Sequence, residues 1–193
     1  MSRRLLEELC PELYMLCEDY NIDLYIYGTC GPKGVGKTTY ANQIALSFHN
    51  SDKNRYAFVM SFANELKEEV NQAFKYIGID VNKVDKETIR PVYQIVGDLR
   101  RDNNKNYYVE RLLDLICTKI SLEVLGLNKE TIVCDDAQTR EVYVCIDDVR
   151  FENEARICDR LEELKRDGVD YTEEHSTETR LPDHLIDQVF HLY

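Results

Sequence analysis

The residues best suited to chemistry in this chain lie at positions 29–39, where glycines precede a lysine and a threonine. Gly31, Gly36, Lys37 and Thr38 fit the spacing G-x-x-x-x-G-K-T, which is typical of loops that bind nucleoside triphosphates. Glycines let consecutive backbone N–H groups curl round an anion, and the helix that follows offers further unpaired N–H groups. The lysine would reach the β- and γ-phosphates, and the threonine hydroxyl would bind Mg²⁺. The sequence therefore predicts a nucleotide site formed by Gly31, Lys33, Gly34, Val35, Gly36, Lys37, Thr38 and Thr39.

The stretches on either side of this loop predict a strand, the loop and then a helix. Residues 24–27 are a short apolar run that leads directly into the loop. After the loop, apolar residues recur at helical spacing, at Ala41, Ile44, Ala45 and Phe48. A glycine-rich turn with an incidental lysine is the alternative, and these flanks favour the nucleotide site over it.

Two carboxylates follow the clearest later strand of the sequence. Residues 142–146 are a β-branched, apolar run suited to the centre of a parallel sheet, and Asp147 and Asp148 come directly after it. In an open α/β sheet, ligands bind at the carboxyl ends of the strands, where the phosphate loop also lies. A carboxylate there could hold Mg²⁺ opposite Thr38. The alternative is that one of the two caps a helix, and both roles are compatible because successive residues point to opposite sides.

Four arginines of this acidic chain, Arg90, Arg100, Arg101 and Arg150, lie in segments expected near the same edge of the sheet. Phosphoryl transfer depends on positioning and on neutralising charge, so an acceptor phosphate needs cations of its own. Arginine supplies them in a bidentate geometry. For any single arginine the alternative is an exposed helix face, and for Arg101 we predict that alternative.

A second nucleotide motif occurs out of context. Residues 82–85 read N-K-V-D, which matches the guanine-reading N-K-x-D of GTPases. In those proteins the motif ends a late strand, whereas here it follows a polar turn and precedes the strand at 142–146. We interpret the match as coincidence.

Strands that alternate with helices predict one α/β domain with a mostly parallel sheet. We expect an N-terminal helical extension at residues 1–22, with a break at Pro11, and the main domain at 23–193. The remaining expected helices lie at 65–74, 86–100, 107–125 and 151–165, and the remaining strands at 23–29, 56–60 and 188–192. Residues 131–134 could be a strand or a loop.

Composition limits the kinds of partner and the cellular compartment that we expect for this protein. The chain has 193 residues and a formal net charge of −12, which argues against a broad nucleic-acid-binding face. Its seven cysteines contain no C-x-x-C pair, so we expect buried free thiols and no disulfide or zinc site. No apolar run approaches membrane-spanning length. We therefore expect a cytoplasmic protein, in the host cytoplasm if the chain is viral, that binds small nucleotides and contacts no membrane.

The most specific stretch, residues 148–155, reads D-V-R-F-E-N-E-A and resembles the D-x-R-F-x-N-E-A signature of phage-type deoxynucleoside monophosphate kinases. Further stretches are similar to segments of that family and occur in the family order. They are residues 61–67, the helix residues Lys86, Arg90, Gln94, Gly97 and Arg100, the pair Tyr107 and Tyr108, and residues 175–178.

The resemblance implies a nucleoside monophosphate kinase-like, three-layer α/β/α fold around the phosphate loop. It also implies an activity: transfer of the ATP γ-phosphoryl group to deoxynucleoside 5′-monophosphates, giving diphosphates, with ATP and Mg²⁺ bound. Carried over by position, the catalytic residues are Lys37, Arg90, Asp148 and Arg150. The metal residues are Thr38, Asp147 and Asp148. The acceptor site would contain Lys67, Arg90, Gln94, Arg100, Arg150, Glu154 and Glu178.

One departure from the family concerns the lid. Relatives of this type have a strand and an arginine-bearing lid after the helix expected at 151–165, whereas only residues 165–174 intervene here before the H-x-S-E-like element. Arg166 and Arg180 both remain open as the lid arginine. Two alternative functions also remain open: a kinase of another small phosphorylated metabolite, and a nucleotide-binding regulatory module with little turnover. The oligomeric state is open too, a homodimer included.

Overall fold

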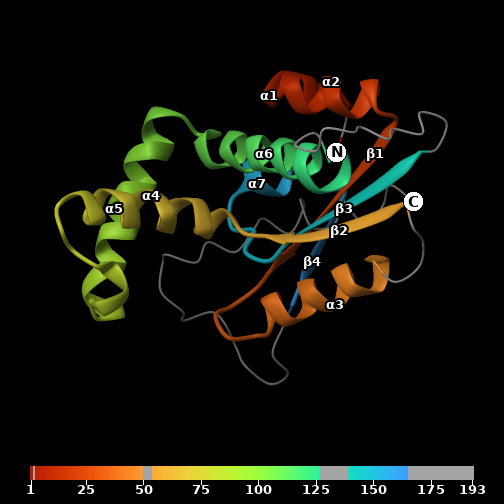
Figure 1. The fold of residues 1–193 in the computed structure, drawn as a ribbon. Helices are drawn as coiled ribbons and strands as arrows, with labels where there is room; N and C mark the ends of the chain where they lie inside the picture. The colour runs from red at the N-terminus through yellow and green to blue at the C-terminus, as the bar shows by residue number, and fades with distance from the viewer. Residues whose placement is uncertain (2, 50–53, 127–138, 165–193) are drawn as a thin grey trace.

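Parallel strands form the centre of the protein. The computed structural model describes residue 1 and residues 3–49, 54–126 and 139–164. Within these residues, four strands lie side by side in the order β2-β3-β1-β4, and every neighbouring pair is parallel (Figure 1). Their bounds are β1 (Ile22–Cys30), β2 (Arg55–Met60), β3 (Arg140–Ile146) and β4 (Arg160–Glu163). The α/β class and the parallel sheet predicted from the sequence are confirmed.

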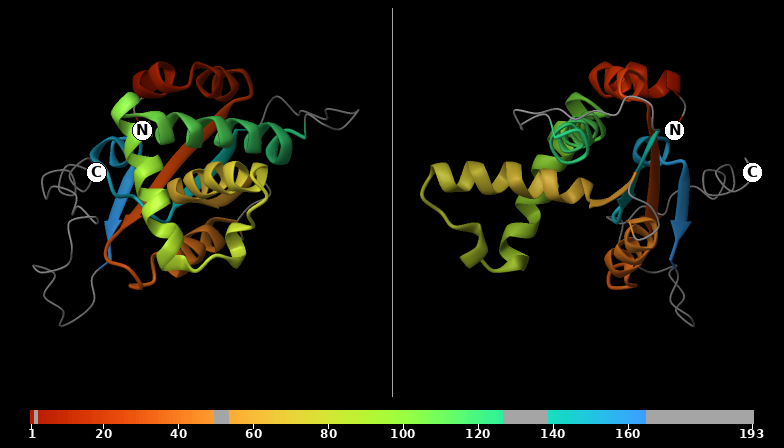
Figure 2. Two further views of the ribbon diagram at one scale, coloured as in Figure 1. Left: turned by 90° about the vertical axis from the view of Figure 1, so that its left-hand side faces the viewer. Right: turned by 45° about the vertical axis from the view of Figure 1, so that its right-hand side comes forward.

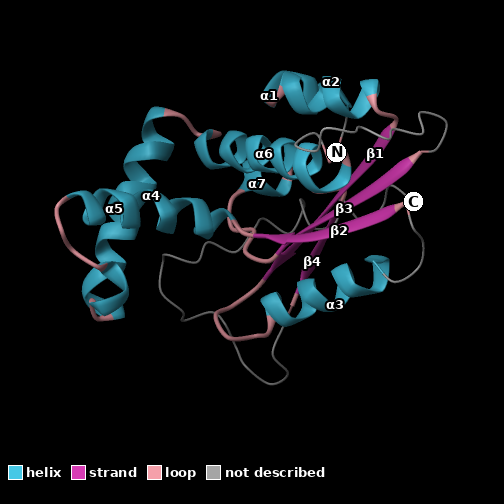
Figure 3. Cartoon of the chain, in the orientation of Figure 1, coloured by secondary structure: helices cyan, strands magenta, loops and turns pink. Residues whose placement is uncertain are grey.

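Helices cover both faces of this sheet (Figures 1 and 3). Side chains of β3 alternate between the faces, as the period of a strand requires. Val142, Val144 and Ile146 join the larger core, which is completed by α1 (Arg3–Leu9), α2 (Pro11–Asp19) and α6 (Tyr107–Lys119). Cys145, on the other face, packs against Ala41 and Ala45 of α3 (Lys37–His49). Helices therefore cover both faces of β3, the strand that Asp147 directly follows.

A helical arm projects beyond the carboxyl edge of the sheet, as the right-hand view of Figure 2 shows. It consists of α4 (Phe62–Tyr76), a 3₁₀ turn at Val81–Lys83 and α5 (Lys86–Asn103), and we call residues 62–103 the α4–α5 arm. A small core of its own, built on Val70, Val81 and Ile89, holds the arm together. After α6, which leads back to the sheet, a π-helical turn follows at Ile120–Val124.

Most of the expected elements are present. The N-terminal helical segment divides at Pro11, the first residue of α2, where a proline needs no hydrogen-bond partner for its missing N–H. The helices expected at 65–74, 86–100 and 107–125 correspond to α4, α5 and α6 with its π-helical turn. The residues expected at 131–134 and 188–192 lie outside the described part of the chain.

The helix expected at 151–165 is wrong. Only Glu152–Ala155 is helical (α7), and the chain then turns and enters β4. Asp159 starts the strand: its backbone N–H donates to Ile26 O at 2.7 Å, and its carboxylate accepts from Ile26 N at 2.7 Å. Leu161, in β4, is fully buried and belongs to the larger core. The free edge of β1 thus draws into a strand a segment whose composition favours a helix, because tertiary pairing overrides local propensity.

Two expectations from composition agree with the described residues. Six cysteines are free thiols there, five of them buried, while Cys134 lies outside the described part. Burial raises the pKa of several of these thiols, including that of Cys145 to about 12. None of the helices in the described ranges is long and apolar enough to cross a membrane.

Candidate active site

The phosphate loop joins the carboxyl end of β1 to the first turn of α3, which begins at Lys37. Gly31 has φ +130°, and a Cβ there would lie 2.3 Å from the carbonyl oxygen of Leu164. A side chain at this position would therefore clash with the backbone that follows β4. Gly36 has φ +98°, a conformation that other residues rarely adopt. Both glycines are thus required by the loop's own geometry.

The Lys37 side chain folds back over the phosphate loop. Its Nζ donates to the carbonyl oxygens of Gly31 and Pro32 at 2.6 and 2.7 Å. The side chain is therefore turned back toward the loop, where an anion bound by the backbone N–H groups would meet it. The other loop residues predicted for the nucleotide, Lys33, Gly34, Val35, Gly36, Thr38 and Thr39, surround it and are exposed or half-buried.

Thr38 and Asp147 meet across the site. The Thr38 hydroxyl donates to Asp147 Oδ2 at 2.5 Å, which joins the first turn of α3 to the end of β3. The other carboxylate oxygen, Asp147 Oδ1, is buried and has no hydrogen-bond partner among the described residues. A buried anionic oxygen without a partner is costly unless a cation or water completes it. This hydroxyl and carboxylate are hard oxygen ligands, which fit Mg²⁺.

Asp148 points the other way, to the α4–α5 arm. Its two carboxylate oxygens accept the backbone N–H groups of Phe62 and Ala63 at 2.8 and 2.7 Å, and the Ser61 hydroxyl also donates to it. Burial raises the pKa of this carboxyl, while these donors act to lower it. Asp148 therefore caps the first turn of α4, where its charge also complements the helix dipole. Of the two aspartates predicted for the metal, Asp147 alone lies against Thr38.

Glu154, predicted in the acceptor site, is a buried carboxylate. Its Oε2 accepts the backbone N–H groups of Arg150 and Phe151 at 2.8 and 3.1 Å, which closes the turn before α7. Burial raises the pKa of Glu154 to about 7. Glu154 is only 3% exposed, so loss of hydration is the main cause of its raised pKa.

Both arginines at the end of α5 make contacts with other parts of the protein. Arg100, assigned to the acceptor, pairs with Glu69 of α4 and lies over the Tyr107 ring at 4.9 Å. Arg101, expected on a solvent-facing surface, lies 4.1 Å from the Phe151 ring centroid and 5.3 Å from that of Tyr108. The expectation for Arg101 is therefore wrong: its guanidinium bridges α5, α6 and the loop after β3.

The other predicted acceptor residues line the arm and the loop beside it. Lys67 on α4, Arg90 and Gln94 on α5, and Arg150 after β3 are all exposed, and none makes an ion pair with another described residue. Arg90 and Gln94 occupy one stripe of α5, because residues four apart lie on the same helix face, and the stripe continues through Gly97 to Arg101. Cations free to bind an anion thus remain on the arm. Glu178 lies outside the described part of the chain.

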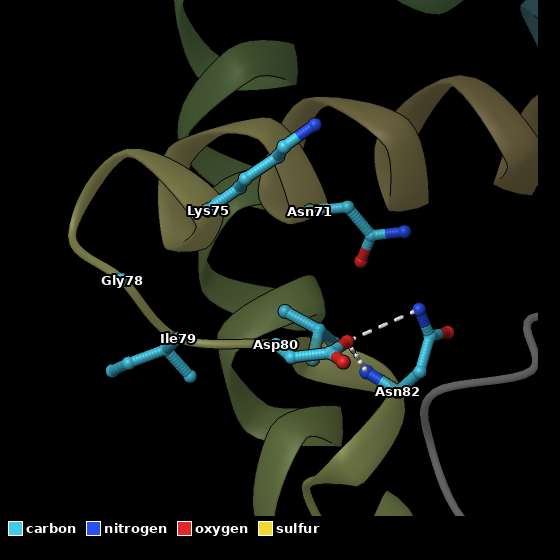
Figure 4. Close-up of a pocket in the computed structure, with 7 residues that line it drawn as sticks. Asn71, Lys75, Gly78, Ile79, Asp80 and Asn82 are labelled. Carbon is cyan, nitrogen blue, oxygen red and sulfur yellow. Dashed lines mark hydrogen bonds between the residues drawn. The ribbon is translucent and has the colours of Figure 1, made fainter.

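The N-K-V-D stretch lies in the α4–α5 arm, directly before α5. Asp80 accepts the backbone N–H of Asn82, and Asp85 caps α5 through the N–H groups of Glu87 and Thr88 at 3.0 and 3.2 Å. A pocket of about 490 Å³ lies beside it, at the turn between α4 and α5 (Figure 4). Its lining is Asn71, Lys75, Gly78, Ile79, Asp80, Val81 and Asn82, so it contains none of the predicted site residues.

The fold thus joins Thr38, after the phosphate loop, to Asp147, the start of α4 to Asp148, and Arg101 of α5 to Phe151 in the loop after β3. The contacts that Asp148 and Arg101 make were not predicted from the sequence. For Arg101 a signal was present, because its spacing from Gly97 and Gln94 places it on the same face of α5 as Arg90. Comparison of the chain with protein-family models finds no match, and comparison with curated proteins finds none either.

Proposed function

We propose that this protein is a kinase that transfers the γ-phosphoryl group of ATP to deoxynucleoside 5′-monophosphates. The observation that carries the proposal is the hydrogen bond from the Thr38 hydroxyl to Asp147 Oδ2, at the mouth of a glycine-rich loop followed by a helix. This pairing of a loop hydroxyl with a strand-end carboxylate is what a Mg²⁺-nucleotide site needs. The acceptor class comes from the resemblance of residues 148–155 to deoxynucleoside monophosphate kinases.

The donor half of the site would hold the triphosphate. Backbone N–H groups of the loop and of the first turn of α3 would bind its oxygens, and Lys37 would move from the Gly31 and Pro32 carbonyls to the β- and γ-phosphates. Thr38 and Asp147 would hold Mg²⁺, with Asp147 Oδ1 gaining the partner that it lacks. When bound, Mg²⁺ neutralises charge on the phosphate oxygens.

The acceptor half would use the cations of the α4–α5 arm and of the loop after β3. Arg90 would bind the acceptor phosphate in a bidentate manner, and Lys67 and Arg150 would add charge beside it. Gln94, four residues after Arg90 on the same helix, could hydrogen-bond the base. Two anionic substrates can approach each other only if cations offset their repulsion.

The reaction itself needs no covalent intermediate. An oxygen of the acceptor monophosphate attacks the γ-phosphorus, and the bond from that phosphorus to the β,γ-bridging oxygen breaks. The bridging oxygen leaves with ADP, and the acceptor becomes a diphosphate. The role of the protein is to align the two phosphates and to neutralise them, which is how phosphoryl-transfer enzymes act.

The decisive experiment is ADP release from ATP and Mg²⁺, measured across a panel of deoxy- and ribonucleoside monophosphates. We expect one or more deoxynucleoside monophosphates to stimulate ADP release strongly and to appear as diphosphates. If none does, while nucleotide still binds at the loop, the kinase proposal fails and a regulatory nucleotide-binding module is favoured. Stimulation by a different phosphorylated metabolite would keep the donor half and replace the acceptor.

A further inference from the structure

The loop that follows β3 contacts both ends of the helical arm and the connection from the arm to α6. We call residues 147–154 the β3 exit loop. Its first contact is Asp148, whose carboxylate binds the backbone N–H groups of Phe62 and Ala63 and so fixes the start of α4. Asp147, the preceding residue, faces Thr38 instead. Adjacent residues thus hold the arm and the nucleotide loop.

The second contact fixes the end of α5. The Arg101 guanidinium lies 4.1 Å from the centroid of Phe151, in the exit loop, and 5.3 Å from that of Tyr108, on α6. A guanidinium both stacks on aromatic faces and is attracted to them by its charge, and here it contacts two rings. Gly97 makes room for it, because a Cβ at that position would come within 3.0 Å of Arg101 Nη1.

The third contact fixes the connection between α5 and α6. The side-chain amide of Asn153 donates to the carbonyl oxygen of Lys105 at 2.7 Å and lies 3.4 Å from Asn106 Oδ1. Glu154 meanwhile closes the exit loop on itself through the N–H groups of Arg150 and Phe151. The loop is therefore attached to the arm at two points, the start of α4 and the end of α5, and at a third point to the connection between α5 and α6.

We infer that Asp148 and Arg101 are positioning residues, which set the distance between the acceptor cations of the α4–α5 arm and the Thr38–Asp147 pair. Neither side chain needs to touch a substrate for this role. The inference rests on the proposed function, because it assigns the arm to the acceptor. It also separates the roles of residues in the D-V-R-F-E-N-E stretch: Asp148 holds the start of α4, Phe151 contacts Arg101 at the end of α5, and Asn153 holds the connection between α5 and α6.

The expected consequence is a selective defect in acceptor use. Misplacing reacting groups by about 1 Å can lower a rate about 100-fold. Loss of either attachment would shift the arm, which carries Arg90, while leaving the phosphate loop, β1 and β3 as they are. Acceptor turnover should therefore fall much more than nucleotide binding.

The first test is Asp148→Asn, with Asp102→Asn on the exposed surface of α5 as the matched control. Asparagine keeps one acceptor oxygen but loses the charge and the second acceptor. We expect kcat/KM for the acceptor to fall by about 10- to 100-fold, while the Kd for Mg²⁺-ATP stays within about threefold. A large loss of Mg²⁺-ATP affinity with an unchanged acceptor KM would instead make Asp148 a metal residue and overturn the inference.

The second test uses two substitutions of Arg101. Lysine keeps the positive charge but cannot stack its ammonium as a planar guanidinium does, and methionine keeps only the apolar stem. If Arg101 positions the arm by stacking, Arg101→Lys and Arg101→Met should lose acceptor kcat/KM to a similar degree. If Arg101→Lys stays close to wild type, the charge matters and not the stacking, and the positioning role is refuted.

Failure of the inference can be told apart from failure of the proposed function by hydrogen exchange. The amides of Phe62 and Ala63 donate to Asp148, so Asp148→Asn should speed their exchange relative to wild type and to Asp102→Asn. This readout needs no substrate. Unchanged exchange at both amides would refute the attachment, whereas faster exchange in a protein that phosphorylates no nucleotide would refute only the function.

Discussion

Thr38 and Asp147 are 109 residues apart in the chain, yet the hydroxyl of the first lies 2.5 Å from the carboxylate of the second. The contact joins the helix after the phosphate loop to the strand at the centre of the sheet. It also leaves Asp147 Oδ1 buried without a partner among the described residues. We regard this pair as the metal-binding end of the donor site, and the first prediction concerns it.

Asp147→Asn and Thr38→Ala should each weaken the response to Mg²⁺. Both substitutions remove an oxygen ligand or its charge, so the Mg²⁺ concentration needed for half-maximal ADP release should rise by about 10- to 100-fold. Ser47→Ala, which removes a hydroxyl from the far end of α3, is the control and should behave as wild type. A Mg²⁺ titration at fixed ATP measures the effect. An unchanged titration in both variants would exclude this pair as the metal site.

Arg90→Ala should weaken acceptor use and spare ATP binding. Hydrogen bonds to charged groups are worth about 1.5–3 kcal/mol, so the acceptor KM should rise by about tenfold or more. Lys75→Ala removes a cation from the far end of α4 and is the matched control. Steady-state kinetics with the acceptor varied, together with ATP binding in its absence, separate the two substrates. Equal loss of ATP binding would show that Arg90 does not belong to an acceptor site.

The donor loop could be predicted because its information is local. A strand, a run of glycines and a helix follow one another in the chain, so the spacing of Gly31, Gly36 and Lys37 is enough to define the loop. The apolar residues of β3 likewise predict a strand at the centre of the sheet. These features need no knowledge of distant partners.

The parts that could not be predicted depend on distant contacts. Residues 160–163 form a strand because the edge of β1 is free to pair with them, which their own composition does not reveal. From the sequence, Asp148 is expected to bind the metal together with Asp147. The structure shows that its carboxylate accepts the N–H groups at the start of α4, a contact that depends on the fold. From the sequence, Arg101 is expected on an exposed face of α5. In the structure its guanidinium contacts the rings of Phe151 and Tyr108, which lie elsewhere in the chain.

Asp85 should contribute to stability and not to the choice of nucleotide. Its carboxylate caps α5, and the loss of such a cap costs about 1 kcal/mol, so Asp85→Ala should lower the free energy of unfolding by that amount. Asp85→Asn, which can still cap, should retain most of it. In both variants the ratio of activity with ATP to activity with GTP should equal that of wild type. A changed ratio would revive the guanine-reading interpretation of residues 82–85.

Glu154 should make stability depend on pH near neutrality. Burial raises its pKa from an ordinary 4.5 to about 7 in the folded protein. Between these values the folded state binds more protons than the unfolded chain, so the contribution of Glu154 to the free energy of unfolding falls as the pH rises. The fall is at most about 1.4 kcal/mol per pH unit. Above the folded-state pKa, the full cost of ionising this buried group is present.

Glu154→Gln should remove this dependence, because glutamine can still accept the N–H groups of Arg150 and Phe151 but does not ionise. Urea unfolding at several pH values should show the variant gaining stability relative to wild type as the pH rises from about 5 to about 8, by an amount on the order of 1–3 kcal/mol. Glu152→Gln, at the exposed start of α7, should follow the wild-type curve. Parallel curves for Glu154→Gln and wild type would show that Glu154 has an ordinary pKa.

Gly28 is packed so closely that a side chain at this position should destabilise the protein. It lies in β1 between β3 and β4, paired with Ile146 and Leu161. A Cβ there would lie 2.6 Å from Cys158 Sγ and 2.9 Å from side-chain carbons of Leu161 and Val149. Gly28→Ala should therefore lower the free energy of unfolding by about 1–3 kcal/mol through overpacking.

A double-mutant cycle identifies the source of that loss. Cys158→Ala removes the sulfur nearest to the new methyl group, so Gly28→Ala should cost less in the Cys158→Ala background than in wild type, with a coupling of about 0.5 kcal/mol or more. Chemical denaturation of the four proteins measures it. Additive losses would mean that the neighbouring side chains absorb the methyl group without the clash, and that the packing of β4 against β1 is looser than the close approach of Cys158 to Gly28 implies.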